Sequence, residues 1–231
     1  AAVRRWMISA VARAMDPGCK VDTMLVLEGA QGVGKSTALA ELARLEWFLD
    51  SMARVSKGKD ALEQLRGKWI VEVAELDALG MRERTEVKSF LGRRVDNYRA
   101  PWDKIAQDYH RRVVFAGTTN ETQWLNDPTG GRRFWPVRVT GPIKVEMIKE
   151  FRDQLWAEAY LAWSAGEQWH LTDAEEALAA VEQERRRSAD ELEEPIWHYI
   201  AEHGLTKVGK KFLLDYLALK FGHHLKQNNA T

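Results

Sequence analysis

A glycine-rich stretch at residues 29–36 constrains the fold of this chain more than any other feature. It matches the pattern G-x-x-x-x-G-K-[ST], with an apolar strand pattern at 24–28 before it and a helical pattern at 37–42 after it. Glycines let the backbone turn tightly and point successive N–H groups at phosphate oxygens, and the N-terminus of the following helix adds positive potential. The stretch, called the glycine loop below, therefore predicts a phosphate-binding loop (P-loop) rather than a turn that binds nothing.

Two side chains at the end of the glycine loop have specific expected roles. Lys35 would reach the β- and γ-phosphates of ATP, and the Ser36 hydroxyl would ligate Mg²⁺. ATP and Mg²⁺ are therefore the expected ligands. The residues predicted to hold the nucleotide are Gly29, Ala30, Gln31, Gly32, Val33, Gly34, Lys35, Ser36 and Thr37.

Composition and charge exclude several other classes of protein. The single cysteine, Cys19, excludes an internal disulfide and a cysteine-based zinc site. No apolar run approaches the roughly 18 residues needed to cross a bilayer, so we expect no membrane partner and a cytoplasmic location. The formal net charge is zero, yet Lys and Arg outnumber Asp and Glu between residues 82 and 112. A basic segment inside a nucleotide-binding domain suggests a polyanionic partner.

Apolar runs alternate with helical patterns along the first part of the chain. This alternation predicts an α/β fold with a largely parallel sheet. After Pro142 the pattern becomes helical, and one of these helices opens with a capping-box pattern at Thr172 and Glu175. Strands are expected at 24–28, 47–49, 69–74, 113–116 and 134–139, and helices at 4–15, 60–65 and 83–91.

Four segments are expected along the chain. The last of them is too short for an independent core, so it either docks on the main domain or is a truncated module. A charged linker at 185–195 ends in Pro195, and helices are expected at 196–203 and 210–221. The segments are an N-terminal helical segment (1–22), the P-loop ATPase core (23–142), the C-terminal helices of the core (143–187) and a small helical module (188–231).

ATP hydrolysis requires one carboxylate beside Mg²⁺ and another that activates the attacking water. The usual pattern on a strand beside the P-loop strand is four apolar residues followed by Asp and Glu (hhhhDE). This chain has Ala74 in place of the aspartate. Glu75 therefore aligns with the catalytic base. Glu72 lies two residues before Ala74 on the same strand face and is the candidate for the metal-side carboxylate. The alternative for Glu72 is an ordinary residue of an edge strand.

Further polar groups follow in the chain. Asn120 comes after an apolar strand and would orient the water and contact the γ-phosphate, unless 118–120 is only a turn. Arg132 and Arg133 lie on a loop that leads into the next strand. An arginine supplied by a neighbouring subunit stabilises charge on the transferring phosphoryl group, which would make one of the pair catalytic. A solvated surface pair is the alternative.

The chain resembles the superfamily 3 helicases, which are hexameric AAA+ motors of viruses and mobile elements. The resemblance lies in the order of the glycine loop, the two glutamates, Asn120 and the arginine pair. The chain is more closely similar to the virulence-associated protein E family, whose members are primase-helicase ATPases of phages and pathogenicity islands. Ala74 departs from the broader helicase pattern. The resembling phrases lie at 26–37, 69–76, 95–102, 118–120 and 131–137.

The resemblance implies a P-loop AAA+ fold of the superfamily 3 type and a ring of identical subunits, expected to be a hexamer, in a bacterial or phage-infected cell. It implies that 95–109 forms a β-hairpin that grips single-stranded or forked DNA, and it is compatible with a primase domain or primase partner. Aromatic and cationic residues interleave there, as in sequence-tolerant single-strand binding. Trp102 could instead be a core anchor. The predicted nucleic-acid contacts are Tyr98, Arg99, Trp102 and Lys104.

Three functions are compatible with these patterns. The leading hypothesis is an ATP-dependent DNA helicase or translocase of mobile-element replication, which hydrolyses ATP at the subunit interfaces of a ring. The second is a nucleotide-dependent DNA-binding or assembly factor with weak hydrolysis, motivated by Ala74. The third is a P-loop kinase for a small molecule, which would carry a mobile lid in place of the strand-tip amide and the arginine pair.

Overall fold

The computed structural model describes residues 1–50, 59–79, 81–101, 103–125, 131–187 and 193–204. The chain divides into two compact units, Ala1–Arg187 and Ser188–Thr231. Within the second unit, the described residues form the helix α7 (Glu193–Glu202) and the turn that follows it. In the described part of the chain, no helix combines the length and apolar character needed to span a bilayer.

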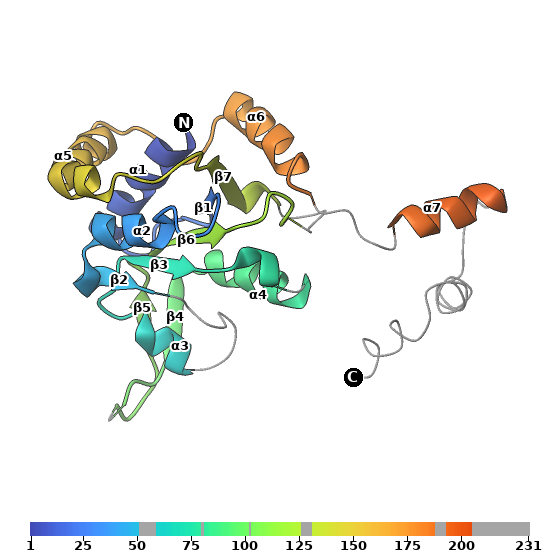
Figure 1. The fold of residues 1–231 in the computed structure, drawn as a ribbon. Coiled ribbons are helices and arrows are strands. Elements are labelled where there is room, and N and C mark those ends of the chain that lie inside the picture. Colours follow the sequence, from blue (N-terminus) through green and yellow to red (C-terminus); the bar gives the residue numbers. More distant parts are fainter. Residues whose placement is uncertain (51–58, 80, 102, 126–130, 188–192, 205–231) are drawn as a thin grey trace. The chain divides into compact units, whose positions relative to one another are not determined.

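A five-stranded parallel sheet forms the centre of the first unit (Figure 1). Its order is β2-β3-β6-β1-β7, and every neighbouring pair is parallel. The central strands are buried on both faces, which explains why they appear in the sequence as continuous apolar runs. The expectation of a mixed α/β fold with a mostly parallel sheet is confirmed. The strands are β1 (Met24–Glu28), β2 (Phe48–Leu49), β3 (Ile70–Val73), β6 (Val114–Thr119) and β7 (Phe134–Arg138).

Helices cover the two faces of the sheet and create two core clusters. In β1, Leu25 faces the cluster that also holds Trp6, whereas Val26 faces the cluster that also holds Phe90, because successive side chains of a strand point to opposite faces. Figure 1 shows α1, α2 and α5 together on one side of the sheet and α4 on the other. The helices are α1 (Ala2–Met15), α2 (Lys35–Ala43), α3 (Lys59–Gln64), α4 (Met81–Leu91), α5 (Val145–Ser164) and α6 (Asp173–Glu184).

Parallel strands give the sheet two chemically different edges. The carboxyl edge is where β1, β3 and β6 end, at Glu28, Val73 and Thr119. The amino edge is where β1 and β7 begin, and the register pairs Met24 with Phe134 there. Ligands of open α/β sheets bind outside the carboxyl ends of the strands, so the carboxyl edge is where a nucleotide site is expected.

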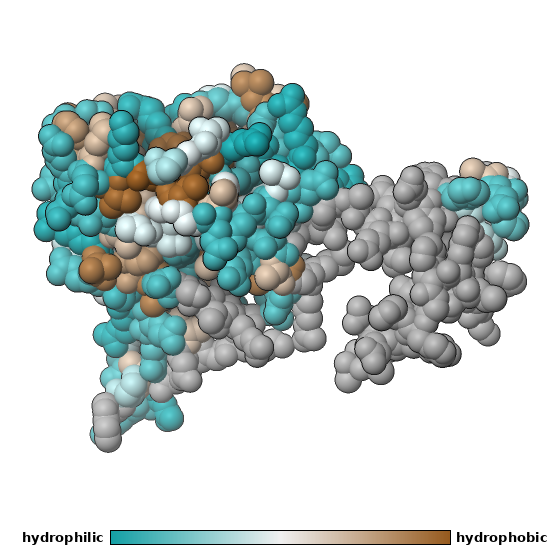
Figure 2. All heavy atoms as spheres, in the orientation of Figure 1, coloured by the Kyte–Doolittle hydropathy of each residue, from teal (hydrophilic) through white to brown (hydrophobic). Residues whose placement is uncertain are grey.

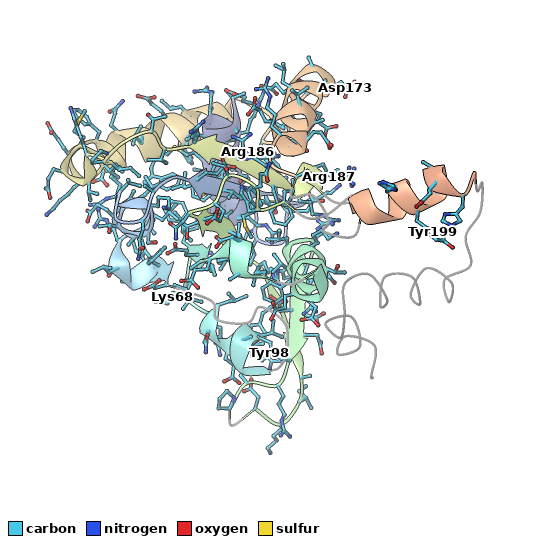
Figure 3. The ribbon with its side chains drawn as sticks, turned by 45° about the vertical axis from the view of Figure 1, so that its right-hand side comes forward. Lys68, Tyr98, Asp173, Arg186, Arg187 and Tyr199 are labelled. Atoms are coloured by element: carbon cyan, nitrogen blue, oxygen red, sulfur yellow. The ribbon has the colours of Figure 1, made fainter. Side chains whose placement is uncertain are left out.

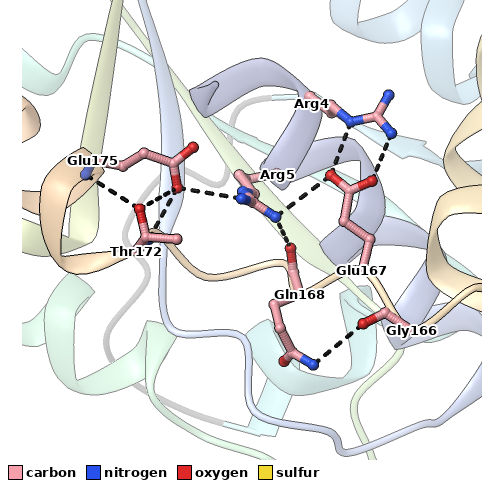
Figure 4. Close-up of polar contacts among 7 residues, drawn as sticks. All are labelled: Arg4, Arg5, Gly166, Glu167, Gln168, Thr172 and Glu175. Atoms are coloured by element: carbon pink, nitrogen blue, oxygen red, sulfur yellow. Dashed lines mark hydrogen bonds and ion pairs between the residues drawn. The ribbon is translucent and has the colours of Figure 1, made fainter.

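Contacts between α1 and the connection from α5 to α6 fix the N-terminal helix in place (Figure 4). Arg4 makes two hydrogen bonds to the Glu167 carboxylate, at 2.9 and 2.6 Å, and Arg5 contacts both Glu167 and Glu175. Glu175 also completes the capping box with Thr172, whose backbone N–H donates to it at 2.9 Å. The predicted capping box is therefore confirmed, and it belongs to a network that joins the first and last helices of this unit.

Two boundaries differ from the sequence predictions. Trp47 was expected in a strand, but it ends a 3₁₀ turn, η1 (Leu45–Trp47), and only Phe48–Leu49 pairs with β3. The linker was expected to end at Pro195, but α7 begins at Glu193. Proline is tolerated in the first turn of a helix because the backbone N–H groups there have no intrahelical acceptor. The helix expected at 210–221 lies outside the described residues.

The predicted β-hairpin is also present, as the separate antiparallel pair β4 (Val95–Tyr98) and β5 (Gln107–His110). Figure 1 shows the two strands running together away from the main sheet. A buried ion pair lies at its base: Arg111 Nε and Nη2 donate to Asp96 Oδ2 and Oδ1 at 2.6 and 2.8 Å, and both residues are at most 5% exposed. The guanidinium also stacks over the Phe90 ring, with Cζ 4.1 Å from the centroid.

We expect Asp96→Ala to lower the free energy of unfolding by about 3–5 kcal/mol, because it leaves the buried Arg111 guanidinium without its carboxylate. Equilibrium denaturation in urea measures the loss. The matched control is Asp108→Ala, which removes an exposed carboxylate from the same hairpin and should cost less than about 1 kcal/mol. Equal stability of the two variants would contradict a structural role for the buried pair.

Candidate nucleotide-binding site

The glycine loop connects the carboxyl end of β1 to the first residue of α2. Gly34 (φ 90°) and Gly32 (φ 81°) adopt the left-handed conformation that favours glycine. Gly29 is needed for a different reason: a Cβ there would lie 2.6 Å from the Val139 carbonyl oxygen. The backbone therefore approaches β7 and turns into the helix as a phosphate-binding loop requires.

The Lys35 ammonium lies inside the glycine loop. Lys35 is 7% exposed, and its Nζ donates to the carbonyl oxygens of Gly29 and Ala30 at 2.6 and 2.9 Å and to Asn120 Oδ1 at 3.0 Å. Burial lowers the pKa of Lys35, while Asp77 and Glu72 act in the opposite direction. All three hydrogen-bond partners are neutral oxygens, so a phosphate oxygen would be a stronger acceptor for this cation.

Glu72 lies beside the Ser36 hydroxyl in the interior of the sheet. It is fully buried, and its Oε1 accepts hydrogen bonds from Ser36 Oγ at 2.6 Å and Thr118 Oγ1 at 2.7 Å. Its Oε2 is buried and has no hydrogen-bond partner among the residues that the structure describes. A buried, unpartnered carboxylate oxygen is costly, and a cation would relieve that cost. Strand β3 lies between β2 and β6, so the alternative interpretation of Glu72 as an edge-strand residue does not hold.

The donor set near Ser36 fits Mg²⁺ bound together with phosphates. Among the described residues, no group of three or more His, Cys, Asp and Glu side chains is arranged to hold a metal alone. Mg²⁺ usually binds through one or two protein oxygens and completes its coordination with phosphate and water. Glu72 and Ser36 supply such a pair of oxygen atoms.

Two acidic residues follow β3 in different environments. Glu75 is exposed and adopts the left-handed conformation, with φ 52° and ψ 49°, at the start of the 3₁₀ turn η2 (Leu76–Ala78). Asp77 is half-buried, and its Oδ1 accepts a hydrogen bond from Thr119 Oγ1 at 2.6 Å. A left-handed conformation is strained for a residue with a Cβ, and such strain concentrates at functional sites.

We expect Glu75→Gly to be more stable than Glu75→Ala by about 1 kcal/mol, because glycine relieves the left-handed strain and alanine retains it. Thermal and urea denaturation of the two variants give the difference directly. Both variants lack the carboxylate, so any ATP hydrolysis that depends on it should be lost in both. Equal stability of the two would show that the backbone at this position carries no strain.

The arginine pair lies far from the glycine loop of its own chain. Arg132 and Arg133 end the 3₁₀ turn η3 (Gly131–Arg133) and directly precede Phe134, which pairs with Met24 at the amino edge. The glycine loop begins five residues along β1, and at about 3.3 Å per residue the separation is about 16 Å. A role in the site of the same chain is therefore excluded by distance.

The two arginines also differ from each other. Arg133 lies 3.7 Å from Asp22 and is 28% exposed. Arg132 is exposed, and within the described part of the chain it has no hydrogen bond or ion pair. Arg132 is therefore the arginine whose guanidinium is available to another molecule.

The hairpin exposes only some of its predicted nucleic-acid contacts. Arg99 and Lys104 are exposed, as that prediction requires, whereas Trp102 lies outside the described residues. Tyr98 is only 6% exposed, and its ring packs against Tyr109 with centroids 4.6 Å apart. The structure therefore buries Tyr98 at the loop end of β4, because alternate residues of a strand face opposite sides and its side is covered.

Sequence reasoning missed several residues around the site. Thr118 was part of a recognised phrase and Asp77 directly follows another, yet only the pairing of β3 with β6 brings them to Glu72 and Thr119. Glu28, immediately before the glycine loop, is buried and accepts hydrogen bonds from Trp124 Nε1 at 2.7 Å and from Arg186. These partners are distant in sequence, so no local pattern indicated them.

Hydrophobic surface gathers around the glycine loop on the face shown in Figure 2, whereas the hairpin below is largely hydrophilic. The backbone N–H of Ile143 donates to the Val33 carbonyl oxygen at 2.9 Å, and Val145 Cγ2 would lie 3.7 Å from a Cβ at Gly34. The segment between β7 and α5 therefore packs against the glycine loop and provides apolar surface next to it.

A comparison with protein-family models identifies the family of this chain. Residues 1–188 match the model of the virulence-associated protein E-like domain. The chain belongs to that family. No curated protein matches it significantly.

Solved structures with a similar fold come from NrS-1. One apo structure of the NrS-1 C-terminal region superposes with a TM-score of 0.54 at 16% identity, covering 93% of this chain and 57% of that one. A second, the A form, gives 0.51 at 17% identity, covering 78% and 46%. At such identities the likeness concerns the fold alone. This chain spans about half the length of those structures.

Proposed function

We propose that this chain is a P-loop AAA+ ATPase that acts as a DNA helicase or translocase in the replication of a mobile element, and that it hydrolyses ATP at the interfaces of a subunit ring. One observation carries the proposal: Glu72 from β3 and Asn120 after β6 converge on Ser36 and Lys35 at the end of the glycine loop. Membership of the virulence-associated protein E-like family supports it.

ATP binding would rest on groups that already point into the loop. Lys35 would exchange the Gly29 and Ala30 carbonyl oxygens for phosphate oxygens, because a charged acceptor forms a stronger hydrogen bond. The backbone N–H groups of the glycine loop and the start of α2 would hold the remaining phosphate charge. Ser36 and Glu72 would hold Mg²⁺, which when bound neutralises developing charge on the phosphate oxygens.

Hydrolysis would use the polar groups at the carboxyl edge. Asn120 Oδ1 accepts a hydrogen bond from Lys35 Nζ, so the Asn120 amide is positioned to orient a water molecule near the terminal phosphate. Glu75 would accept the proton of that water as it attacks phosphorus and ADP leaves. Arg132 of a neighbouring subunit would stabilise charge on the transferred group, since the same residue of the own chain is too distant.

The second candidate, a nucleotide-dependent DNA-binding or assembly factor with weak hydrolysis, has its own supporting observation. Glu75 is exposed, and the acidic residues whose charges act on Lys35 are Asp77 and Glu72. Comparing the affinity for ATP with the turnover rate in the presence of DNA separates the two functions. Tight binding with negligible turnover would favour the second.

The decisive experiment measures the ATPase rate with and without single-stranded DNA. We expect DNA to stimulate hydrolysis and Lys35→Ala to abolish it. Lys149→Ala, which removes an exposed lysine from α5, is the matched control and should keep the wild-type rate. Hydrolysis that is indifferent to DNA and unchanged in Lys35→Ala would overturn the proposal.

A further inference from the structure

A pocket of about 450 Å³ lies at the base of the hairpin, away from the glycine loop. Its lining comes from the turn before β3, from β4 and β5, and from the segment that leads into β6, so it belongs to the amino edge of the sheet. Figure 3 labels two residues of the lining, Lys68 before β3 and Tyr98 at the end of β4. Its volume falls within the range of about 300–1,000 Å³ for ligand pockets.

Aromatic rings form much of the wall of this hairpin-base pocket. Tyr98 and Tyr109 pack together from the two hairpin strands, and Trp47 and Trp69 also line the pocket. Trp47 is 44% exposed, which is unusual for so large an apolar ring in a packed unit. Aromatic faces that remain accessible inside a pocket are surfaces on which a nucleobase can stack.

The charge of the lining is positive. Arg66, Lys68 and Arg112 contribute cations, and in the described part of the lining Asp96 is the only acid. Asp96 is already paired with Arg111, so its charge does not compensate the other three. Lys68 Nζ donates to a backbone carbonyl oxygen, and the Arg66 guanidinium lies 5.1 Å from the centroid of the Tyr109 ring. These cations remain available to an anion.

We propose that this hairpin-base pocket binds one nucleotide of a single strand of nucleic acid, with the base against the aromatic wall and the phosphate on Arg66, Lys68 and Arg112. The inference rests on the proposed function in one respect, namely that the exposed Arg99 and Lys104 of the same hairpin hold the strand. The pocket would then fix one nucleotide at the root of the hairpin. Phosphate contacts and base stacking together give binding that tolerates any sequence.

The affinity for a fluorescein-labelled oligothymidylate, measured by anisotropy without ATP, tests the cations. Arg66→Ala should weaken binding and reduce the slope of log affinity against log salt by about 0.7, the contribution of one phosphate contact on a single strand. Arg185→Ala, which removes an exposed arginine from the end of α6, should leave both quantities unchanged. An unchanged affinity and slope in Arg66→Ala would overturn the proposal.

Photo-crosslinking distinguishes a nucleotide within a bound strand from a free mononucleotide in the pocket. A strand that carries 5-iododeoxyuridine should crosslink to Trp47, Trp69 or Tyr109, and thymidine monophosphate should compete only weakly. Crosslinks confined to other residues, or competition by the monophosphate at the concentration of the strand, would overturn the proposal. All these assays omit ATP, so a chain without ATPase activity can still support this inference, and a DNA-stimulated ATPase can still contradict it.

Discussion

Glu72→Gln is expected to reduce ATP hydrolysis by about 10²-fold or more while leaving the fold intact. The carboxylate is fully buried, its Oε1 accepts hydrogen bonds from Ser36 and Thr118, and in the described part of the chain its Oε2 has no hydrogen-bond partner. Glutamine keeps the shape and one acceptor oxygen but removes the charge that would hold Mg²⁺. Because a buried charge is costly, the melting temperature should not fall. Steady-state hydrolysis and thermal denaturation measure the two effects.

The control for this prediction is Glu150→Gln, the same chemical change at an exposed position on α5. It should keep the wild-type rate and stability. The dependence of nucleotide binding on Mg²⁺ adds a second readout: wild-type protein should bind a fluorescent ATP analogue more tightly with Mg²⁺ than with EDTA, and Glu72→Gln should lose most of that difference. Hydrolysis within tenfold of wild type would remove Glu72 from the metal site.

The effect of Glu72→Gln on hydrolysis also bears on Ala74, which stands where the usual hhhhDE pattern has aspartate. If Glu72 supplies the metal-side carboxylate, the longer glutamate side chain two residues earlier on β3 replaces the missing group. A loss of hydrolysis in Glu72→Gln would therefore explain how the chain tolerates alanine at position 74. Retained hydrolysis, together with tight ATP binding, would instead favour the nucleotide-dependent assembly factor.

Much of the fold could be predicted from the sequence because its signals are local. The buried strands appear as apolar runs, the glycine loop requires particular residues at fixed spacing, and the Thr172 capping box is a contact between residues three apart. Trp47 was misassigned because one aromatic residue beside a strand carries no information on where pairing begins. Tertiary pairing decided that boundary.

The candidate site was less predictable, since its groups meet only in the folded sheet. The pairing of β3 with β6 brings Thr118 to Glu72, and no sequence pattern specifies that register. Tyr98 illustrates the opposite case: aromatic and basic spacing indicated an exposed contact, but the hairpin turns this ring toward Tyr109 and the pocket. Spacing predicts which residue types occur together, and the direction of each side chain depends on packing.

The two edges of the sheet give the strongest argument for a shared site. The groups proposed to bind phosphate and metal lie at the carboxyl edge, whereas Arg132 and the hairpin-base pocket lie at the amino edge. A single chain therefore cannot bring Arg132 to its own glycine loop. In a ring whose subunits pack the amino edge of one against the carboxyl edge of the next, the arginine of each subunit would reach its neighbour's nucleotide.

Arg132→Ala is accordingly expected to retain ATP binding and to lose about 10³-fold or more of hydrolysis, which is the size of effect that a catalytic arginine has in other phosphoryl-transfer enzymes. Arg133→Ala should have a smaller effect on hydrolysis, because Arg133 faces Asp22 of its own chain. A mixture of two inactive variants provides a sharper measurement than either variant alone. Arg132→Ala and Lys35→Ala proteins, each inactive alone, should regain part of the wild-type rate together, since some interfaces then combine an intact glycine loop with an intact arginine.

Dilution gives an independent check of the same idea. If the site is shared, the rate per subunit should fall as the wild-type protein is diluted below the concentration at which subunits associate, whereas a site complete within one chain would keep a constant rate. Full hydrolysis in Arg132→Ala, or a mixture no more active than its components, would show that Arg132 does not act between subunits. The exposed guanidinium would then be a solvated surface group.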